Sequence, residues 1–180
     1  MRFVQIASGI DTTPVLVELA RHADLWDRHP MRRITPDSPH AQMTDITVRY
    51  QPEDDVTSET RRGEHRNVFW PAWYKLPSLR PLVFGLMARV QAVELGSILI
   101  TKLPPGGEIT MHSDAGSWAP TFYSTKAHVQ LAGFSVTTVE GEEFAQRAGD
   151  VITFDNLLMH GIRNIGENDR IECIISMRCE

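Results

Sequence analysis

Three residues in the second half of the chain are of types that could hold a metal ion: His112, Asp114 and His160. His112 and Asp114 stand two residues apart at the end of a predicted strand, so strand alternation sends both side chains to the same face. Two imidazoles and one carboxylate form a ligand set that holds non-haem Fe(II) and leaves other metal positions open. The His-x-Asp pair alone is a weak signal, because a chain with seven histidines often contains one by chance.

The residues around His160 strengthen this interpretation. Phe154 and Asp155 precede the histidine, and Arg170 follows it at the start of another predicted strand. A hairpin between the two strands would bring His160 and Arg170 into one cavity. A guanidinium suits a carboxylate deep in a barrel because it is planar, permanently charged and bidentate. The sequence therefore predicts an anion site close to the metal.

This part of the chain resembles the aspartyl/asparaginyl β-hydroxylase-like branch of the Fe(II)- and 2-oxoglutarate-dependent oxygenases. The resemblance covers roughly residues 97–177. It rests on Pro105-Gly106 ahead of His112, on Phe154-Asp155 ahead of His160, and on Arg170 beyond them. It implies a mainly β fold with flanking helices, namely a double-stranded β-helix or jelly-roll, cupin-like barrel. It also implies Fe(II) as the metal, with 2-oxoglutarate and O₂ as co-substrates.

By position, the resemblance implies roles for four further side chains. Arg170 would anchor the distal carboxylate of 2-oxoglutarate, with the Thr101 hydroxyl beside it. His128 would contact the carboxylate nearest the metal, supported by the cation of Lys126. The family often has arginine where this chain has Lys126, so bidentate recognition is not expected there, and Lys126 is equally consistent with a solvated side chain. Asp114 supplies a carboxylate ligand that some members lack.

The implied activity is hydroxylation of an amino acid, a peptidyl side chain or a related small molecule, with release of succinate and CO₂. Desaturation or epimerisation remains open, because the ligand set does not fix the fate of the substrate radical. Halogenases tend to lack the carboxylate that Asp114 supplies. A non-catalytic cupin-like barrel that binds a small acid or a metal is the alternative from another class. Hydrolases are disfavoured by the absence of a Gly-x-Ser-x-Gly motif and of a recognisable nucleophile setting.

Length, composition and charge narrow the remaining classes. A chain of 180 residues suits one domain, and its 42% hydrophobic and 23% charged residues are typical of globular proteins. The formal net charge of −5 argues against nucleic-acid and anionic-membrane partners. The longest apolar stretch, residues 81–87, is far shorter than the ~20 residues of a membrane span. We expect a cytoplasmic protein with Cys173 and Cys179 as free thiols and a small-molecule or peptidyl substrate.

Hydrophobic periodicity predicts the elements that must position these residues. The first half should contain a helix over residues 12–23, a loop over 28–39, a strand over 44–50, a loop over 51–67 and a helix carrying Leu82 to Val93 that ends at Gly96. The second half should contain eight short strands, over residues 97–102, 108–112, 127–134, 136–140, 143–147, 151–155, 159–163 and 170–177. We expect one domain in which residues 1–96 cover a barrel formed by residues 97–178.

Several aromatic and basic residues are also candidates for a substrate site. For the aromatic residues Trp70, Trp73, Tyr74, Trp118 and Tyr123, packing in the core is the favoured interpretation for most. For the arginines, a solvated surface is favoured; these are Arg32, Arg33, Arg49, Arg61, Arg62, Arg66 and Arg163.

Overall fold

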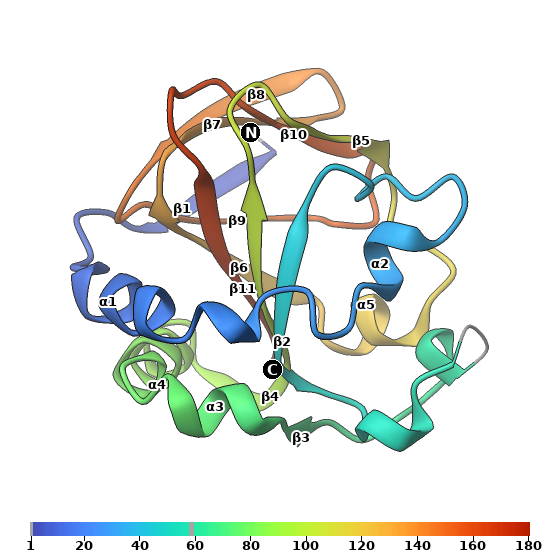
Figure 1. Cartoon of the computed structure of the whole chain (residues 1–180). Helices are drawn as coiled ribbons and strands as arrows, with labels where there is room; N and C mark the ends of the chain where they lie inside the picture. Colours follow the sequence, from blue (N-terminus) through green and yellow to red (C-terminus); the bar gives the residue numbers. More distant parts are fainter. Residues whose placement is uncertain (1, 58–59) are drawn as a thin grey trace.

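Two antiparallel sheets form the framework of the computed structural model, which describes residues 2–57 and 60–180 (Figure 1). Within the described residues, the large sheet has seven strands and the small sheet four. In spatial order, the large sheet consists of β1 (Phe3–Ala7), β9 (Val151–Phe154), β6 (Thr125–Ala132), β11 (Arg170–Cys179), β4 (Ala92–Leu103), β2 (Thr44–Tyr50) and β3 (Val68–Phe69). The small sheet consists of β5 (Glu108–His112), β10 (His160–Asn164), β7 (Phe134–Val139) and β8 (Glu142–Arg147).

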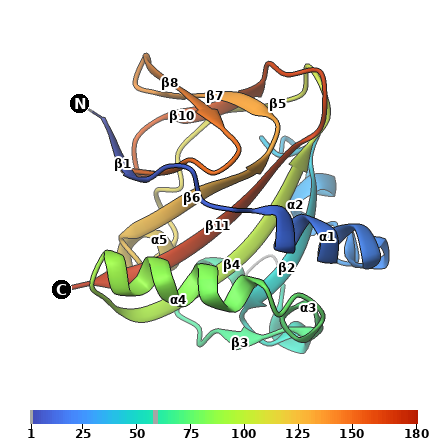
Figure 2. The ribbon, with the colours of Figure 1, turned by 90° about the vertical axis from the view of Figure 1, so that its left-hand side faces the viewer.

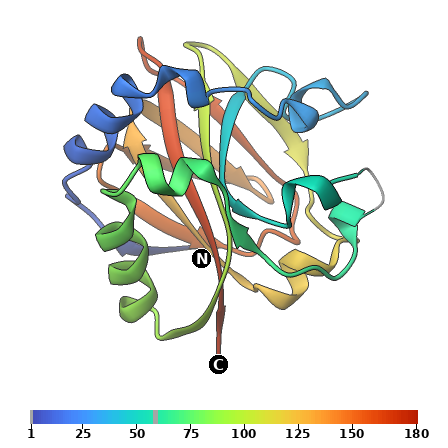
Figure 3. The ribbon, with the colours of Figure 1, turned by 60° about the horizontal axis from the view of Figure 1, so that its bottom comes forward.

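Helices cover the face of the large sheet that points away from the small sheet, as Figures 2 and 3 show for α1, α3 and α4. The helices are α1 (Thr13–Arg21), α2 (Met31–Ile34), α3 (Pro71–Lys75), α4 (Leu79–Arg89) and α5 (Trp118–Phe122). Single 3-10 turns lie at Ala23–Leu25, Glu53–Asp55 and Thr60–Arg62. In the described part of the chain, no helix is long and apolar enough to cross a membrane.

The main hydrophobic core lies between these helices and the large sheet. Val129 of β6 and Ile175 of β11 are fully buried there, against α4 residues such as Val83. Alternation along the same strands sends His128 and Glu172 to the opposite face. That face meets the small sheet, because the β7 hydroxyl of Ser135 lies 3.2 Å from the inward-facing Gln130 of β6. The layer between the two sheets therefore contains these polar side chains together with two smaller apolar clusters, one around Phe154 and one around Leu103.

The predicted fold class is confirmed: the protein is mainly β, with an antiparallel jelly-roll framework and flanking helices. The strands predicted over residues 44–50 and 108–112 have the same bounds as β2 and β5. The hairpin predicted between His160 and Arg170 is wrong. β10 pairs with β5 and β7 in the small sheet, whereas β11 pairs with β4 and β6 in the large sheet. The intervening turn thus joins the two sheets.

The predicted helix ending at Gly96 is too long. α4 ends at Arg89, and Gln91 takes a left-handed backbone conformation with φ of 56°, which turns the chain into β4. Gly96 lies inside that strand, where a Cβ atom would stand 2.7 Å from Cγ of Tyr123. The glycine therefore permits close packing of an aromatic ring instead of terminating a helix.

Other short elements also differ from the prediction. α2 occupies part of the expected loop over residues 28–39, and α5 was not predicted. β1 was missed as well, and it pairs with β9 through Phe3 and Phe154. The expected division at residue 96 falls inside β4, and strands β1, β2 and β3 from the N-terminal half extend the large sheet.

Candidate metal centre

His112 and His160 face each other across two paired strands of the small sheet. The two residues are direct partners in the β5–β10 register, and their ring centroids lie 4.3 Å apart. Gly161 follows His160, and a Cβ atom there would stand 2.9 Å from Sδ of Met111 and 3.1 Å from the carbonyl oxygen of Ile109. The glycine thus allows β10 to lie close to β5, which keeps the two imidazoles adjacent.

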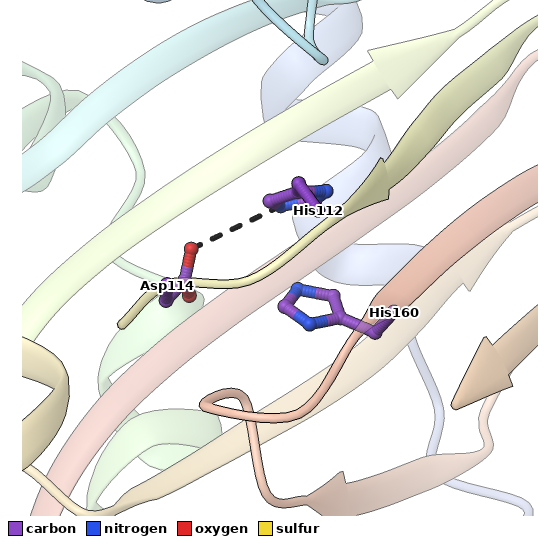
Figure 4. A group of neighbouring side chains, drawn as sticks. All are labelled: His112, Asp114 and His160. Atoms are coloured by element: carbon purple, nitrogen blue, oxygen red, sulfur yellow. Dashed lines mark ion pairs between the residues drawn. The ribbon is translucent and has the colours of Figure 1, made fainter. Parts of the chain in front are cut away.

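Asp114 lies in the turn after β5, and the chain before β10 holds this turn in place. The Asp114 amide donates to the carbonyl oxygen of Asn156 at 3.0 Å, and the Ser113 hydroxyl donates to the carbonyl oxygen of Leu157 at 2.7 Å. One potential ligand atom from each of Asp114, His112 and His160 lies within 4.8 Å of the others. Figure 4 shows the three side chains pointing toward one another, with Nε2 of His112 3.9 Å from Oδ1 of Asp114.

Both imidazoles are hydrogen bonded in a way that frees one nitrogen for a metal. Nδ1 of His112 lies 2.8 Å from the carbonyl oxygen of Thr110, and Nδ1 of His160 lies 2.9 Å from the carbonyl oxygen of Leu158. A carbonyl oxygen only accepts hydrogen bonds, so each Nδ1 carries the proton and donates. The Nε2 lone pairs then remain available, and such backbone partners commonly orient metal-binding histidines.

The charge states also suit a divalent cation. Burial is the main cause that lowers the pKa of His160 to about 4, so this imidazole is neutral at pH 7. Burial alone would raise the pKa of Asp114, but the Lys126 ammonium and the two nearby imidazoles outweigh it and lower that pKa to about 2. Two imidazoles whose Nδ1 atoms donate to backbone carbonyls, together with one carboxylate, match the donor set for non-haem Fe(II). These residues therefore fit the implied metal.

Arg170, Glu172 and His128 form a second polar cluster in the layer between the sheets. Arg170 and Glu172 are both fully buried, and Nη2 of Arg170 contacts Oε1 of Glu172. Nη1 of Arg170 also donates to the Thr101 hydroxyl at 3.4 Å, and its Nε donates to Oε1 of Gln130 at 3.3 Å. Oε2 of Glu172 lies 3.3 Å from Nδ1 of His128.

Phe154 connects this cluster to the metal centre. Its ring stacks on His128 with centroids 4.6 Å apart and lies 5.2 Å from the ring of His160. Asn156, two residues later, has Nδ2 3.5 Å from Nε2 of His128. The Phe154 ring thus packs between His160 and His128 of the second cluster.

The structure brings the predicted site residues together in these two groups. His112, Asp114 and His160 form one of them, and Arg170, Thr101 and His128 belong to the other. Lys126 is not the solvated side chain that the sequence also allowed, because its ammonium contacts the carboxylate of Asp114 and its side chain is largely buried. The roles of all these predicted site residues as metal ligands or co-substrate contacts stay predictions.

Sequence reasoning missed Glu172, Asn156 and His40. Glu172 had a usable signal, because a residue two positions after Arg170 on a strand lies on the same face. The His40 ring lies 5.0 Å from that of His112, and its Nε2 accepts a hydrogen bond from Nη2 of Arg32 at 3.3 Å. The contact between His40 and His112 joins segments that are distant in the sequence, so no local sequence pattern indicated it.

The aromatic residues have different positions. Trp70, Trp73 and Tyr123 are buried, consistent with packing, whereas Tyr74 is exposed. Tyr123 also lines a hollow of about 630 Å³ with Trp118 of α5. The other residues of this hollow are Arg49, Glu64, His65, Arg66, Asn67, Glu94 and Phe122.

The arginine at the surface forms an ion pair, whereas an arginine at this hollow forms hydrogen bonds with backbone carbonyls. Arg163 forms an exposed ion pair with Glu143 at 3.1 Å, as expected of a solvated arginine. Arg49 instead donates from Nη1 to the carbonyl oxygen of Asn67 and from Nη2 to that of Leu95. It is therefore partly withdrawn from solvent.

Comparison with protein families identifies the chain. The family model described as aspartyl/asparaginyl beta-hydroxylase matches residues 72–179, which include both polar clusters. The chain belongs to this family. The resemblance inferred from the His-x-Asp, Phe-Asp and distal arginine signals is therefore confirmed. A search of curated proteins finds no match.

A solved structure with a TM-score above 0.5 shows the same fold. An oxidoreductase of the 2OG-Fe(II) oxygenase family from Burkholderia pseudomallei is 21% identical, with a TM-score of 0.53, and the match covers 88% of this chain and 76% of that one. A conserved protein of unknown function from Streptococcus pyogenes is 19% identical with a TM-score of 0.37. That match covers 47% of this chain and 65% of the other, less than two thirds of its length. At 21% identity, the likeness to the Burkholderia protein concerns the fold alone.

Proposed function

We propose that this member of the aspartyl/asparaginyl β-hydroxylase family is an Fe(II)- and 2-oxoglutarate-dependent oxygenase that hydroxylates an amino acid, a peptidyl side chain or a related small molecule. The observation that carries the proposal is the convergence of His112, Asp114 and His160, with both imidazole Nε2 atoms free of backbone partners. Fe(II), 2-oxoglutarate and O₂ together would supply oxidation of an unactivated C–H bond, with release of succinate and CO₂.

The protein's own residues would orient the ligands and the co-substrate. The backbone acceptors of Thr110 and Leu158 fix the tautomer of each imidazole. The Lys126 ammonium keeps Asp114 ionised and contacts its Oδ2, whereas Oδ1 lies 3.9 Å from Nε2 of His112. Arg170 supplies the buried cation for the distal carboxylate of 2-oxoglutarate, and Thr101 supplies a hydroxyl beside it.

We place the substrate entrance at the hollow lined by Trp118 and Tyr123. Trp118 follows Asp114 by four residues, which limits the separation of their Cα atoms to about 14 Å. The hollow combines the cations of Arg49 and Arg66 with the carboxylate of Glu94. Side chains of both charge signs suit the carboxylate and ammonium groups of an amino acid, which supports a substrate of that class.

Binding of 2-oxoglutarate to the iron-loaded protein tests the proposal directly. Anaerobic addition of Fe(II) and 2-oxoglutarate should produce a weak visible charge-transfer band, and admission of air with amino-acid or peptide mixtures should produce succinate. The absence of the band at saturating co-substrate would exclude the oxygenase. A band without succinate for any mixture would instead favour the non-catalytic barrel.

Substitution of the carboxylate ligand separates a metal role from a structural role. Asp114→Asn should weaken Fe(II) binding and abolish succinate formation, whereas Asp169→Asn changes an exposed carboxylate and should leave both unchanged. Unaltered Fe(II) affinity in Asp114→Asn would show that the two histidines suffice.

A further inference from the structure

Arg170, the cation expected to receive a co-substrate carboxylate, already contacts a carboxylate of the protein. Glu172 lies two residues further along β11, so both side chains lie on the same face of the strand. Both are fully buried, with Nη2 of Arg170 against Oε1 of Glu172. Among the described residues, no other carboxylate forms an ion pair with this guanidinium.

Few positively charged groups lie near the Arg170–Glu172 pair. Thr101 and Gln130, the hydrogen-bond partners of Arg170 on the neighbouring strands, are neutral. Within the part of the chain that the structure describes, the one other titratable side chain that forms a hydrogen bond or ion pair with these two residues is His128, 3.3 Å from Glu172. A second carboxylate at Arg170 would therefore place two anions beside one permanent cation in a fully buried layer. Repulsion between like charges is strong where water is excluded.

We propose that Glu172 is an internal competitor for Arg170 and thereby sets the affinity and selectivity of the site for a 2-oxo diacid. The distal carboxylate of the co-substrate displaces Glu172 from Nη2 of Arg170. Glu172 then turns to His128, and this pair takes up one proton from solvent, which balances the added negative charge. This inference rests on the proposed function.

The opposite role for Glu172 predicts the opposite result. If Glu172 instead braced Arg170 in its binding orientation, loss of the carboxylate would weaken co-substrate binding. A competitor gives tighter binding when its charge is removed, because the distal carboxylate then meets an uncompensated guanidinium. The sign of the change in affinity therefore decides between the two roles.

The test compares two 2-oxo acids of equal chain length in three proteins. Wild type, Glu172→Gln and Glu143→Gln are loaded anaerobically with Fe(II) and titrated in a calorimeter with 2-oxoglutarate and with 2-oxopentanoate, which has a methyl group in place of the distal carboxylate. Glu143 carries an exposed charge in an ion pair with Arg163, so its variant controls for the loss of one negative charge.

Glu172→Gln should bind 2-oxoglutarate at least about tenfold more tightly than wild type, because one like charge has left the buried site. Its affinity for 2-oxopentanoate, and all affinities of Glu143→Gln, should change by less than about twofold. Equal or weaker binding of 2-oxoglutarate by Glu172→Gln would overturn the inference while leaving the proposed function intact. Failure of all three proteins to bind either acid would contradict the proposed function itself.

A measurement on the wild type keeps the inference testable even if Glu172→Gln does not fold. Calorimetry in two buffers of different ionisation enthalpy gives the number of protons taken up on binding. Wild type should take up about one more proton with 2-oxoglutarate than with 2-oxopentanoate, because the monoacid brings no distal charge to the pair. Equal proton uptake for the two acids would show that Glu172 and His128 do not compensate the distal carboxylate.

Discussion

The two faces of the large sheet use the same strands for opposite purposes. On the helix-covered face, Val129 and Ile175 pack among aliphatic side chains. On the face toward the small sheet, their neighbours His128 and Glu172 form a buried ionic and hydrogen-bonded layer. Apolar burial contributes to stability in proportion to area, whereas a buried charge requires a matched partner. We therefore expect the first face to contribute most of the apolar stabilisation, and the proposed ligand contacts lie on the second face.

This division has a simple origin in strand geometry. Successive side chains point to opposite faces, so one strand serves both layers without any insertion or irregular loop. β11 illustrates the point, because Arg170 and Glu172 alternate with Ile171 and Cys173. A substitution should therefore affect either packing or ligand binding according to its position in the strand.

The largest expected effect is on the metal centre. His160→Ala removes one of two facing imidazoles and should lower Fe(II)-dependent succinate formation by more than about a thousandfold, since a metal site depends on its ligand count. Its melting temperature without metal should stay close to that of wild type. His22→Ala, a histidine at the end of α1, is the matched control and should retain activity. If His160→Ala bound Fe(II) as tightly as wild type does, His160 would not be a metal ligand.

Breaking the buried ion pair should produce the next largest effect. Arg170→Leu leaves the Glu172 carboxylate buried without its main cation and should lower the free energy of unfolding by about 3–5 kcal/mol. The double variant Arg170→Leu/Glu172→Leu should be more stable than this single variant, because no unpaired charge remains. Urea unfolding measures both. Additive losses in the double variant would show that the pair contributes through packing, like the opposite face.

On the helix-covered face, a cavity should reduce stability without altering the metal site. Ile175→Ala should lower the free energy of unfolding by about 2–5 kcal/mol, which is typical for a large buried aliphatic residue. Fe(II) affinity should not change at temperatures where the variant is folded. Val93→Ala, at a position that is 49% exposed, serves as the control and should cost far less. A loss of Fe(II) affinity in Ile175→Ala would show that the two faces are coupled.

The separation of the faces also explains what the sequence could predict. β2 and β5 were predicted with their observed bounds because alternation of polar and apolar residues is a local signal. The candidate metal residues were selected by residue type and spacing, and the structure brings them together. Asp114, however, lies in the turn after β5, so strand alternation is not what places it near His112. These inferences needed no knowledge of which strands pair.

Features that depend on pairing were missed. The turn after β10 leads into the other sheet, and only long-range pairing distinguishes this from a hairpin. β1 forms at the sheet edge by pairing with β9, which lies far along the chain. The contact between Glu172 and His128 likewise requires β6 and β11 to be neighbours. Local periodicity carries no information about such partners.

The smallest expected effect is a pH dependence confined to the polar face. Burial alone would raise the pKa of Glu172, but Arg170 and His128 outweigh it and lower the pKa from 4.5 to about 2. A carboxylate with a depressed pKa stabilises the folded state above its unfolded pKa, and this stability is lost as the pH falls toward the folded value. Linkage gives a loss of about 1 kcal/mol at about pH 3.5 relative to pH 7.

Glu172→Gln removes this dependence because the amide does not titrate. Its unfolding free energy should therefore fall less between pH 7 and about pH 3.5 than that of wild type, by about 1 kcal/mol. Glu143→Gln, which alters an exposed pair, should keep the wild-type slope. Urea unfolding at the two pH values measures the difference. Parallel slopes for wild type and Glu172→Gln would mean that the ion pair between the sheets does not hold Glu172 ionised, and the electrostatic contrast between the two faces would then fail.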